Sequence, residues 1–203
     1  MKSPSRKAPY HHGDLREALL RAAEAELTEK GFEGFSLRSV AKRAGVSHAA
    51  PAHHFADTGA LLTALATIAA ERLTRSMVDR HARAEKTPRA QFIASGIGYV
   101  EFALANPALF KLMFGSERPK SDDARLMHHA GEAFTVLVED IRAIVGSDPM
   151  ESDQGKLDIA AAWCLVHGIA NLLIANRLRF ARPMFDDDFE GTLTSLIERV
   201  APR

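Results

Sequence analysis

The chain of 203 residues has 26 basic and 26 acidic side chains, so its formal net charge is zero, and 46% of its residues are hydrophobic. These values fit a globular protein and exclude a uniformly basic coat for nucleic acid. Cys164 is the single cysteine, which excludes an intramolecular disulfide. The longest nearly apolar run, 159–170, is too short to span a bilayer, and no apolar signal core precedes it. We therefore expect a cytoplasmic protein that binds no membrane.

Positive charge gathers toward the N-terminal end of the chain. Residues 1–47 hold nine Lys/Arg and six Asp/Glu, a net charge of +3, and five of the nine histidines fall within the first 54 residues. Phosphate groups would favour protonation of such histidines. The bias is modest and is also compatible with an ordinary solvated surface.

Helical periodicity with capping residues dominates the sequence, and no segment has the alternation of a strand. The first predicted helix, 14–30, places on one face Leu15, Ala18, Leu19, Ala22 and Leu27. A second helix, 36–44, ends at Gly45, which allows a left-handed turn. Val46 then forms an apolar plug, and Ser47 can cap a short third helix, 48–54. Asp57 can cap a long fourth helix, 58–84.

Five more helices are predicted in the rest of the chain. They are expected from residue 88 to the Asn106-Pro107 break, at 107–114, at 124–145, at 153–178, and from the acidic run 186–188 to about residue 200. The predicted fold class is therefore all-α, with about nine helices.

The stretch 35–62, FSLRSVAKRAGVSHAAPAHHFADTGALL, has the pattern of a helix-turn-helix. In that motif the second helix enters the major groove of DNA. Small helical hairpins with the same turn also serve as plain packing units, so the pattern by itself leaves both interpretations open. The amphipathic helix before it and the Asp-capped helix after it favour DNA binding.

From Tyr10 to Leu62 the chain resembles the DNA-binding domain of the TetR family of transcriptional regulators, including the spacing between elements. In the body, NPALFKLMFG at 106–115 and Trp163 with His167-Gly168 are similar to the C-terminal domain of the TetR subgroup named for its Trp-His-Gly motif. The resemblance implies a DNA-binding domain at 1–60 and an effector-binding and dimerisation domain at 61–203. It also implies a homodimer that binds a double-stranded DNA operator and a small-molecule effector.

Candidate DNA contacts come from the two short helices of the motif. His48 can hydrogen-bond a base edge, and Ala49 and Ala50 can contact a thymine methyl group. Arg38 can reach a phosphate or a guanine, and helix starts favour a phosphate oxygen. The complete predicted set is Ser36, Arg38, Ser47, His48, Ala49, Ala50, His53, His54 and Thr58. The purely structural alternative makes both serines helix caps and Arg38 a solvated side chain.

Two positions depart from the family pattern. Ala52 stands where a phosphate-binding tyrosine is usual, and Thr58 stands where a lysine is usual. The chain thereby loses a hydrogen bond and a contact that releases a counterion. An N-terminal arm can compensate through Lys2, Arg6, Lys7, Tyr10, His11 and His12. Pro51 also removes the first hydrogen bond of helix 48–54 if Ser47 is its cap.

Trp163 and His167 lie four residues apart and share one helix face. They form either a packed pair in the core or the wall of an effector cavity, since both roles require apolar surroundings. The predicted effector-binding set is Phe102, Phe110, Met113, Phe114, Phe134, Trp163 and His167.

We predict no metal site, no cofactor and no enzymatic activity. The pairs His53-His54 and His128-His129 are adjacent residues, and neighbours on a helix point about 100° apart, so each pair alone is a poor chelator. Cys164 lies in an apolar stretch and is expected to be a buried small hydrophobe.

The predicted function is that of a TetR-like repressor released from a palindromic operator by an effector. Dimerisation is predicted through the last two long helices, which carry Leu165, Ile169, Leu172, Leu173, Ile174, Leu193, Leu196, Ile197 and Val200. The alternative, which Ala52 and Thr58 motivate, is a helical ligand-binding or interaction protein whose head has lost specific DNA binding. Affinity for the chain's own upstream DNA, relative to random DNA, distinguishes the two.

Overall fold

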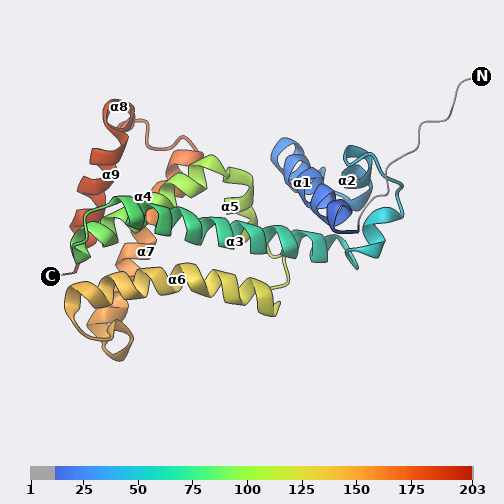
Figure 1. The fold of residues 1–203 in the computed structure, drawn as a ribbon. Coiled ribbons are helices and arrows are strands. Elements are labelled where there is room, and N and C mark those ends of the chain that lie inside the picture. Colours follow the sequence, from blue (N-terminus) through green and yellow to red (C-terminus); the bar gives the residue numbers. More distant parts are fainter. Residues whose placement is uncertain (1–11, 203) are drawn as a thin grey trace, which may run out of the picture.

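The computed structural model describes residues 12–202, and this part of the chain is helical and contains no strand. A small head at one end consists of α1 (His12–Lys30), α2 (Leu37–Arg43) and the 3-10 turn η1 (Ala50–His53) (Figure 1). From the head, α3 (Thr58–Arg83) runs along the body for 26 residues. The domain boundary proposed at residues 60 and 61 therefore falls inside one continuous helix.

The body is a helical bundle around α3. Its other elements are α4 (Pro88–Ala105), α5 (Pro107–Phe114), α6 (Ala124–Val145), η2 (Pro149–Glu151), α7 (Asp153–Ile174), α8 (Arg182–Asp187), α9 (Phe189–Ile197) and η3 (Glu198–Val200). Both α4 and α6 pack against α3, and α7 packs against α4. The helices α8 and α9 lie at the end of the body opposite the head (Figure 1). One hydrophobic cluster continues from the head into the body.

Local capping explains where the predicted helices of the head begin and end. The Ser36 hydroxyl accepts a hydrogen bond from the Ser39 N–H at 3.1 Å and caps α2. The Asp57 carboxylate accepts one from the Ala60 N–H at 2.6 Å and caps α3. Gly45 has a φ of +69° in the turn after α2. The predictions for Asp57 and Gly45 are confirmed, and at Ser36 the structure shows the capping role that was given as the structural alternative.

The α-helix predicted at 48–54 is wrong, because this segment forms only the 3-10 turn η1. An α-helix capped by Ser47 would need its first internal hydrogen bond from the N–H of residue 51, and Pro51 has none. Instead, the Ala50 N–H donates to the Ser47 carbonyl at 3.0 Å, three residues back. The turn has no side-chain cap, so Ser47 contributes a backbone oxygen and not its hydroxyl.

The C-terminal helices also differ from those predicted. After Ile174, the end of α7, Asn176 adopts a left-handed conformation with a φ of +52°. The Arg177 N–H donates to the Leu172 carbonyl at 2.8 Å, which closes the helix before residue 178. Asp188 separates α8 from α9 and caps α9 by accepting from the Gly191 N–H at 2.9 Å. The described residues thus contain nine α-helices, but two of them replace one predicted C-terminal helix.

Among the described residues, α7 is the single helix whose length and hydropathy would allow it to cross a membrane. One face of α7 is buried in the protomer through Ile159, Val166 and Ile169. Leu157 and Leu172, also on α7, are exposed. The helix therefore carries more apolar surface than the protomer core covers.

Close approach of α3 and α4 requires the glycine at position 98. A Cβ atom there would lie 2.5 Å from the backbone oxygen of Ser76 and 2.8 Å from Met77 Cα. The Ser76 hydroxyl donates to the Gly98 carbonyl at 2.8 Å. The backbones of α3 and α4 are therefore in direct contact at Gly98.

We expect Gly98→Ala to lower the free energy of unfolding by about 1–3 kcal/mol, because the added methyl group must push the two backbones apart. The matched control is Gly131→Ala in α6, where a Cβ meets nothing within 4 Å. That control should stabilise by up to about 1 kcal/mol through its lower backbone entropy. Urea unfolding at equal protein concentration compares them, and equal effects of both variants would contradict the packing role.

Candidate DNA-binding surface and effector cavity

An ion-pair cluster that sequence reasoning missed fixes α2 against α1. Arg43 Nε donates to Glu26 Oε2 at 2.7 Å, and Arg43 Nη1 donates to Glu29 Oε1 at 2.8 Å. The Glu26 side chain is buried and also pairs with Lys30. Hydrogen bonds from Lys30 and Arg43 outweigh the effect of burial and lower the pKa of Glu26 to about 2. Arg43 is therefore engaged inside the head.

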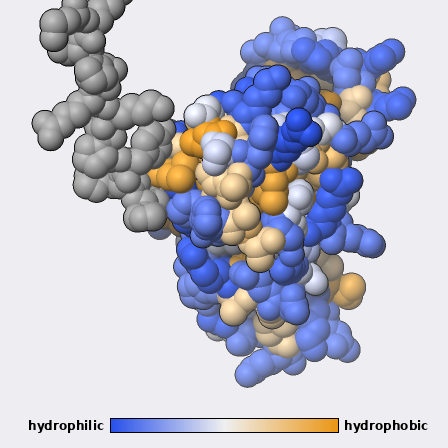
Figure 2. All heavy atoms as spheres, turned by 90° about the vertical axis from the view of Figure 1, so that its right-hand side faces the viewer, coloured by the Kyte–Doolittle hydropathy of each residue, from blue (hydrophilic) through white to orange (hydrophobic). Residues whose placement is uncertain are grey.

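The predicted DNA-contacting residues lie in the head and at the start of α3. The exposed ones are Ser36, Arg38, Ser47, His48, Ala49 and His53, and the partly buried ones are Ala50, His54 and Thr58. Figure 2 looks at this end of the molecule and shows mostly hydrophilic residues with a few hydrophobic ones between them. His54 also lines a cleft where the head meets α3 and the start of α6.

Some of the Lys and Arg side chains of the head form ion pairs with carboxylates, so fewer of them are available to phosphates than their number in the sequence suggests. Arg21, Lys30 and Arg43 form ion pairs within the head. Arg38 and Lys42 are exposed and form no ion pair with the described residues. The proposed N-terminal arm lies outside the residues whose side chains are described. Attraction to phosphates from the described part of the head is therefore modest.

Both departures from the family pattern lie after α2, one within η1 and the other at the start of α3. Ala52 is exposed within η1, and Thr58 is the first residue of α3, directly after the capping residue Asp57. A longer side chain at position 52 would extend into open surroundings. These positions are therefore suitable for restoring phosphate contacts.

An apolar cavity of about 150 Å³ opens in the body between α3, α4, α6 and α7. Four of the predicted effector-binding residues line it, namely Met113, Phe114, Phe134 and Trp163. Phe114, Phe134 and Trp163 are also partly exposed, as residues at the mouth of a cavity are. The lining that sequence reasoning missed includes Leu73, Met77, Phe92, Tyr99 and Val166.

Three predicted effector-binding residues do not line this cavity. Phe110 is buried behind Phe114, with ring centroids 5.0 Å apart. Phe102 is buried and borders a separate shallow cleft between α3 and α4. His167 lies behind the wall and contacts Tyr99. Helical periodicity identifies an apolar face, but it does not separate residues that fill the core from residues that border a cavity.

Tyr99 and Ser95 are the residues with hydroxyl groups among those that line the cavity. The Tyr99 hydroxyl lies 2.9 Å from His167 Nδ1. Burial raises the pKa of Tyr99 and lowers that of His167, so both side chains are neutral near pH 7. Ser95 adds a second polar group to the lining, and its hydroxyl lies 2.6 Å from the buried carboxylate of Asp140. The side-chain hydroxyl groups of this otherwise apolar lining are therefore those of Tyr99 and Ser95.

A loop connects the cavity to the head. It begins directly after Phe114, which lines the cavity, and covers residues 115–123. Arg118 Nη1 donates at 2.9 Å to the carbonyl of Phe32, which lies in the turn directly after α1. The Lys120 N–H donates to Thr63 Oγ1 at 2.9 Å, and Lys120 Nζ lies 3.5 Å from the Asp57 carboxylate. Contacts thus run continuously from the cavity wall to the helix-turn-helix.

Comparison with known proteins gives two family matches. Residues 19–65 match the family described as bacterial regulatory proteins, tetR family, and residues 92–198 match the tetracyclin repressor-like C-terminal domain. Together with the helix-turn-helix head and the helical body, these matches define a bacterial transcriptional regulator.

Solved structures share the fold of this chain. A protein with unknown function from Rhodococcus sp. RHA1 is 33% identical, with a TM-score of 0.78 over 96% of this chain and 97% of that chain. The TetR family regulator PfmR from Thermus thermophilus is 19% identical, with a TM-score of 0.65 over 90% and 96% of the two chains. A TetR family regulator from Marinobacter aquaeolei is 20% identical, with a TM-score of 0.65 over 93% and 96%. No curated protein matches the chain.

The chain belongs to the TetR family. This family consists of DNA-binding transcriptional regulators that form homodimers and bind small-molecule effectors, and it is generally non-enzymatic.

Proposed function

We propose that the chain is a cytoplasmic, non-enzymatic repressor whose homodimer leaves a partly palindromic operator when a small apolar molecule binds. The observation that carries the proposal is the apolar cavity, which contacts connect to the DNA-binding head. Two heads must present their recognition segments about 34–36 Å apart to enter successive major grooves. An effector releases DNA only if it binds the conformation with the wrong spacing more tightly.

The size and lining of the cavity support a specific class of effector. An apolar cavity of about 150 Å³ in another protein accommodates benzene. The cavity of this chain has that volume, and Tyr99, whose hydroxyl lies 2.9 Å from His167 Nδ1, is the hydrogen-bonding partner that we propose for an effector. We propose an aromatic or similarly small hydrophobic effector that carries one hydrogen-bonding group. The position of Trp163 and His167 beside the cavity also supports the proposed likeness to the Trp-His-Gly subgroup.

A stripe on α7 is the proposed centre of the dimer interface. At helical spacing it carries Leu157, Ala161, Cys164, Gly168 and Leu172. Cys164, predicted to be buried, is exposed in the protomer because its face of α7 is uncovered. Small residues in the middle of the stripe allow a second copy of the helix to approach closely.

We propose that the C-terminal helix contributes less to this interface than its apolar stripe suggests. Leu193 and Ile197 on α9 are buried inside the protomer, so they cannot be the surface that meets a partner. Leu196 and Val200 are partly buried and remain candidates at its edge. The physical reason is that α9 packs against α4 with the same apolar stripe.

A hydroxyl group on a small aromatic probe is expected to distinguish the proposed cavity from ordinary packing defects. Phenol should bind the chain more tightly than toluene by roughly threefold to tenfold, because it adds one hydrogen bond to Tyr99. Both probes should change the fluorescence of Trp163, the only tryptophan. Tyr99→Phe should remove the preference for phenol while toluene binding stays. An unchanged emission with both probes up to their solubility would reject the cavity as a binding site.

Restoring the two family residues is expected to strengthen DNA binding. Ala52→Tyr with Thr58→Lys should tighten binding, and the added lysine should steepen the plot of log affinity against log salt by about one unit. Thr135→Lys, on the exposed surface of α6 away from the head, adds the same charge and is the matched control. Equal slopes for both variants would show that position 58 does not face a phosphate.

A further inference from the structure

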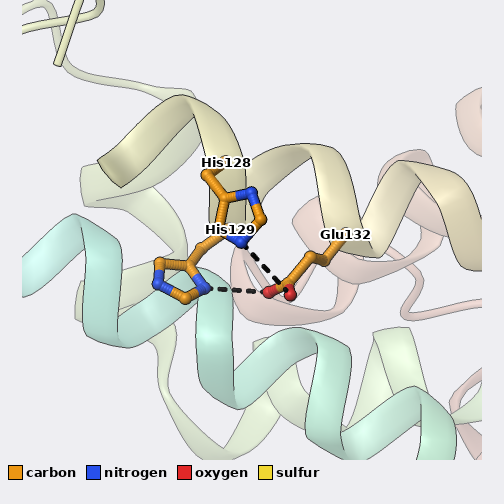
Figure 3. Close-up of side chains that lie close together, drawn as sticks. All are labelled: His128, His129 and Glu132. Carbon is orange, nitrogen blue, oxygen red and sulfur yellow. Dashed lines mark hydrogen bonds and ion pairs between the residues drawn. The ribbon is translucent and has the colours of Figure 1, made fainter. Parts of the chain in front are cut away.

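Two histidines and two carboxylates meet where α6 packs against α3. Figure 3 shows the three of these side chains that belong to α6. His129 Nδ1 lies 2.8 Å from Glu132 Oε2, and His128 Nε2 lies 3.7 Å from Glu132 Oε1. One potential ligand atom from each of these three residues lies within 4.8 Å of the others. On the opposite side of the ring, His129 Nε2 lies 3.2 Å from Glu71 Oε1 of α3.

The argument from helix geometry against an adjacent histidine pair does not hold at this position. Side chains at neighbouring positions leave a helix in different directions, but an imidazole has two nitrogens at different distances from the backbone. His128 reaches the carboxylate with its distal Nε2, and His129 reaches it with its proximal Nδ1. Glu132 lies three and four residues after the two histidines, so its carboxylate contacts both rings (Figure 3).

We propose that His128, His129 and Glu132 form a binding site for a divalent transition-metal ion, for which Zn²⁺ is the best match. Two imidazoles and one carboxylate, with a free position for water, are an established ligand set for zinc. Nitrogen and oxygen ligands of a tetrahedral zinc ion lie about 3.4 Å apart, given bond lengths near 2.0–2.1 Å. The separations of 2.8 Å and 3.7 Å, which end on the two different oxygens of Glu132, lie on either side of this value. Rotations of the three side chains would bring one nitrogen of each histidine and one carboxylate oxygen onto a common ion, since these atoms already lie within 4.8 Å of one another.

Glu71 supports the site from a second helix. Metal-binding histidines usually donate their other ring N–H to a carboxylate, which fixes the tautomer that leaves a lone pair for the metal. The Glu71 carboxylate lies 3.2 Å from His129 Nε2 and is the group placed to accept this N–H when Nδ1 faces the metal. The His129 side chain is only 22% exposed, whereas that of His128 is 69% exposed, so α3 holds the inner ligand in place. A bound ion would thus join the second turn of α6 to α3.

The alternative is a set of exposed ion pairs that bind no metal, since such pairs contribute little by themselves. The two interpretations differ in what Glu71 does. If zinc binds elsewhere on the chain, loss of the Glu71 carboxylate leaves its affinity unchanged, whereas loss of a supporting carboxylate typically changes metal affinity by roughly 10-fold to 100-fold.

Calorimetric titration of the full-length, tag-free chain with Zn²⁺ alone tests the proposal. All proteins carry His11→Gln and His12→Gln, which removes a competing adjacent pair. We expect one zinc ion per chain, and a tetrahedral visible spectrum when Co²⁺ replaces zinc. His128→Gln with Glu132→Gln should weaken binding by roughly 100-fold or more, and Glu71→Gln should weaken it by roughly 10-fold.

The adjacent pair His53-His54 provides the matched control. His53→Gln should leave zinc affinity unchanged, because this exposed residue lies outside the proposed site. Circular dichroism before titration confirms that each variant is folded. Wild-type affinity in the His128→Gln, Glu132→Gln variant, or failure of the parent protein to bind zinc, would overturn the proposal. The result does not depend on DNA binding, so it stands or falls separately from the proposed function.

Discussion

Gly168→Leu is expected to convert the dimer into a monomer and to reduce affinity for the operator by roughly 100-fold or more, because the second half-site no longer adds to binding. Gly168 is partly buried and lies in the middle of the α7 stripe, between the exposed residues Cys164 and Leu172. A Cβ at this position meets nothing within 4 Å in the protomer. The protomer therefore tolerates a leucine, whereas a second helix in close contact with Gly168 would not.

The matched control is Gly131→Leu on α6. Its Cβ also meets nothing within 4 Å, so both variants add the same side chain to an open helix surface. Light scattering at micromolar concentration gives the oligomeric state, and thermal unfolding shows that both variants are folded. A dimeric Gly168→Leu protein with normal operator affinity would place the interface elsewhere.

Arg43→Met is expected to loosen the helix-turn-helix and to abolish tight DNA binding. The substitution keeps the apolar stem but removes the charge that pairs with Glu26 and Glu29. Glu26 is then a buried carboxylate whose remaining cationic partner in the described structure is Lys30, which is costly. Amide hydrogen exchange in α2 should accelerate by roughly 10-fold or more.

Arg21→Met is the control for this prediction. Arg21 pairs with Glu17 at 3.4 Å, and both side chains are mostly exposed, so its loss should leave exchange nearly unchanged. Exchange in α2 that is equally fast in the Arg43→Met and Arg21→Met proteins would show that Arg43 does not hold the head together.

The ion-pair cluster around Glu26 also predicts a pH dependence of stability. The pKa of Glu26 is lowered from 4.5 to about 2, so its stabilising contribution is complete above pH 4.5 and is lost as the pH falls toward 2.

Features that depend on neighbouring residues were predictable from the sequence. Ser36 and Asp57 act as caps and Gly45 forms the turn as expected, because capping and left-handed turns are decided within a few residues. Pro51 has no N–H, so the sequence also indicates that a third helix capped by Ser47 would lack its first hydrogen bond. Its consequence, a single 3-10 turn, depends on which of two hydrogen-bonding patterns the segment adopts.

Features that depend on contacts between distant residues were not predictable in the same way. The cluster of Glu26 and Arg43 joins residues 17 positions apart, and periodicity carries no information about such pairs. Tyr99 and Phe102 lie on the same apolar helix, but one borders the cavity and the other does not. The convergence of His128 and His129 depends on which ring nitrogen each uses.

The most direct test of the central claim is the affinity of the dimer for the DNA upstream of its own coding sequence, compared with random DNA of equal length across a series of salt concentrations. A specific regulator should bind a site in its own upstream DNA at least about 10³-fold more tightly than random DNA at physiological salt. The modest number of free cations in the described head predicts a shallow salt dependence. Equal affinity for both DNAs at every salt concentration would contradict the account and favour a helical ligand-binding protein that has lost specific DNA binding.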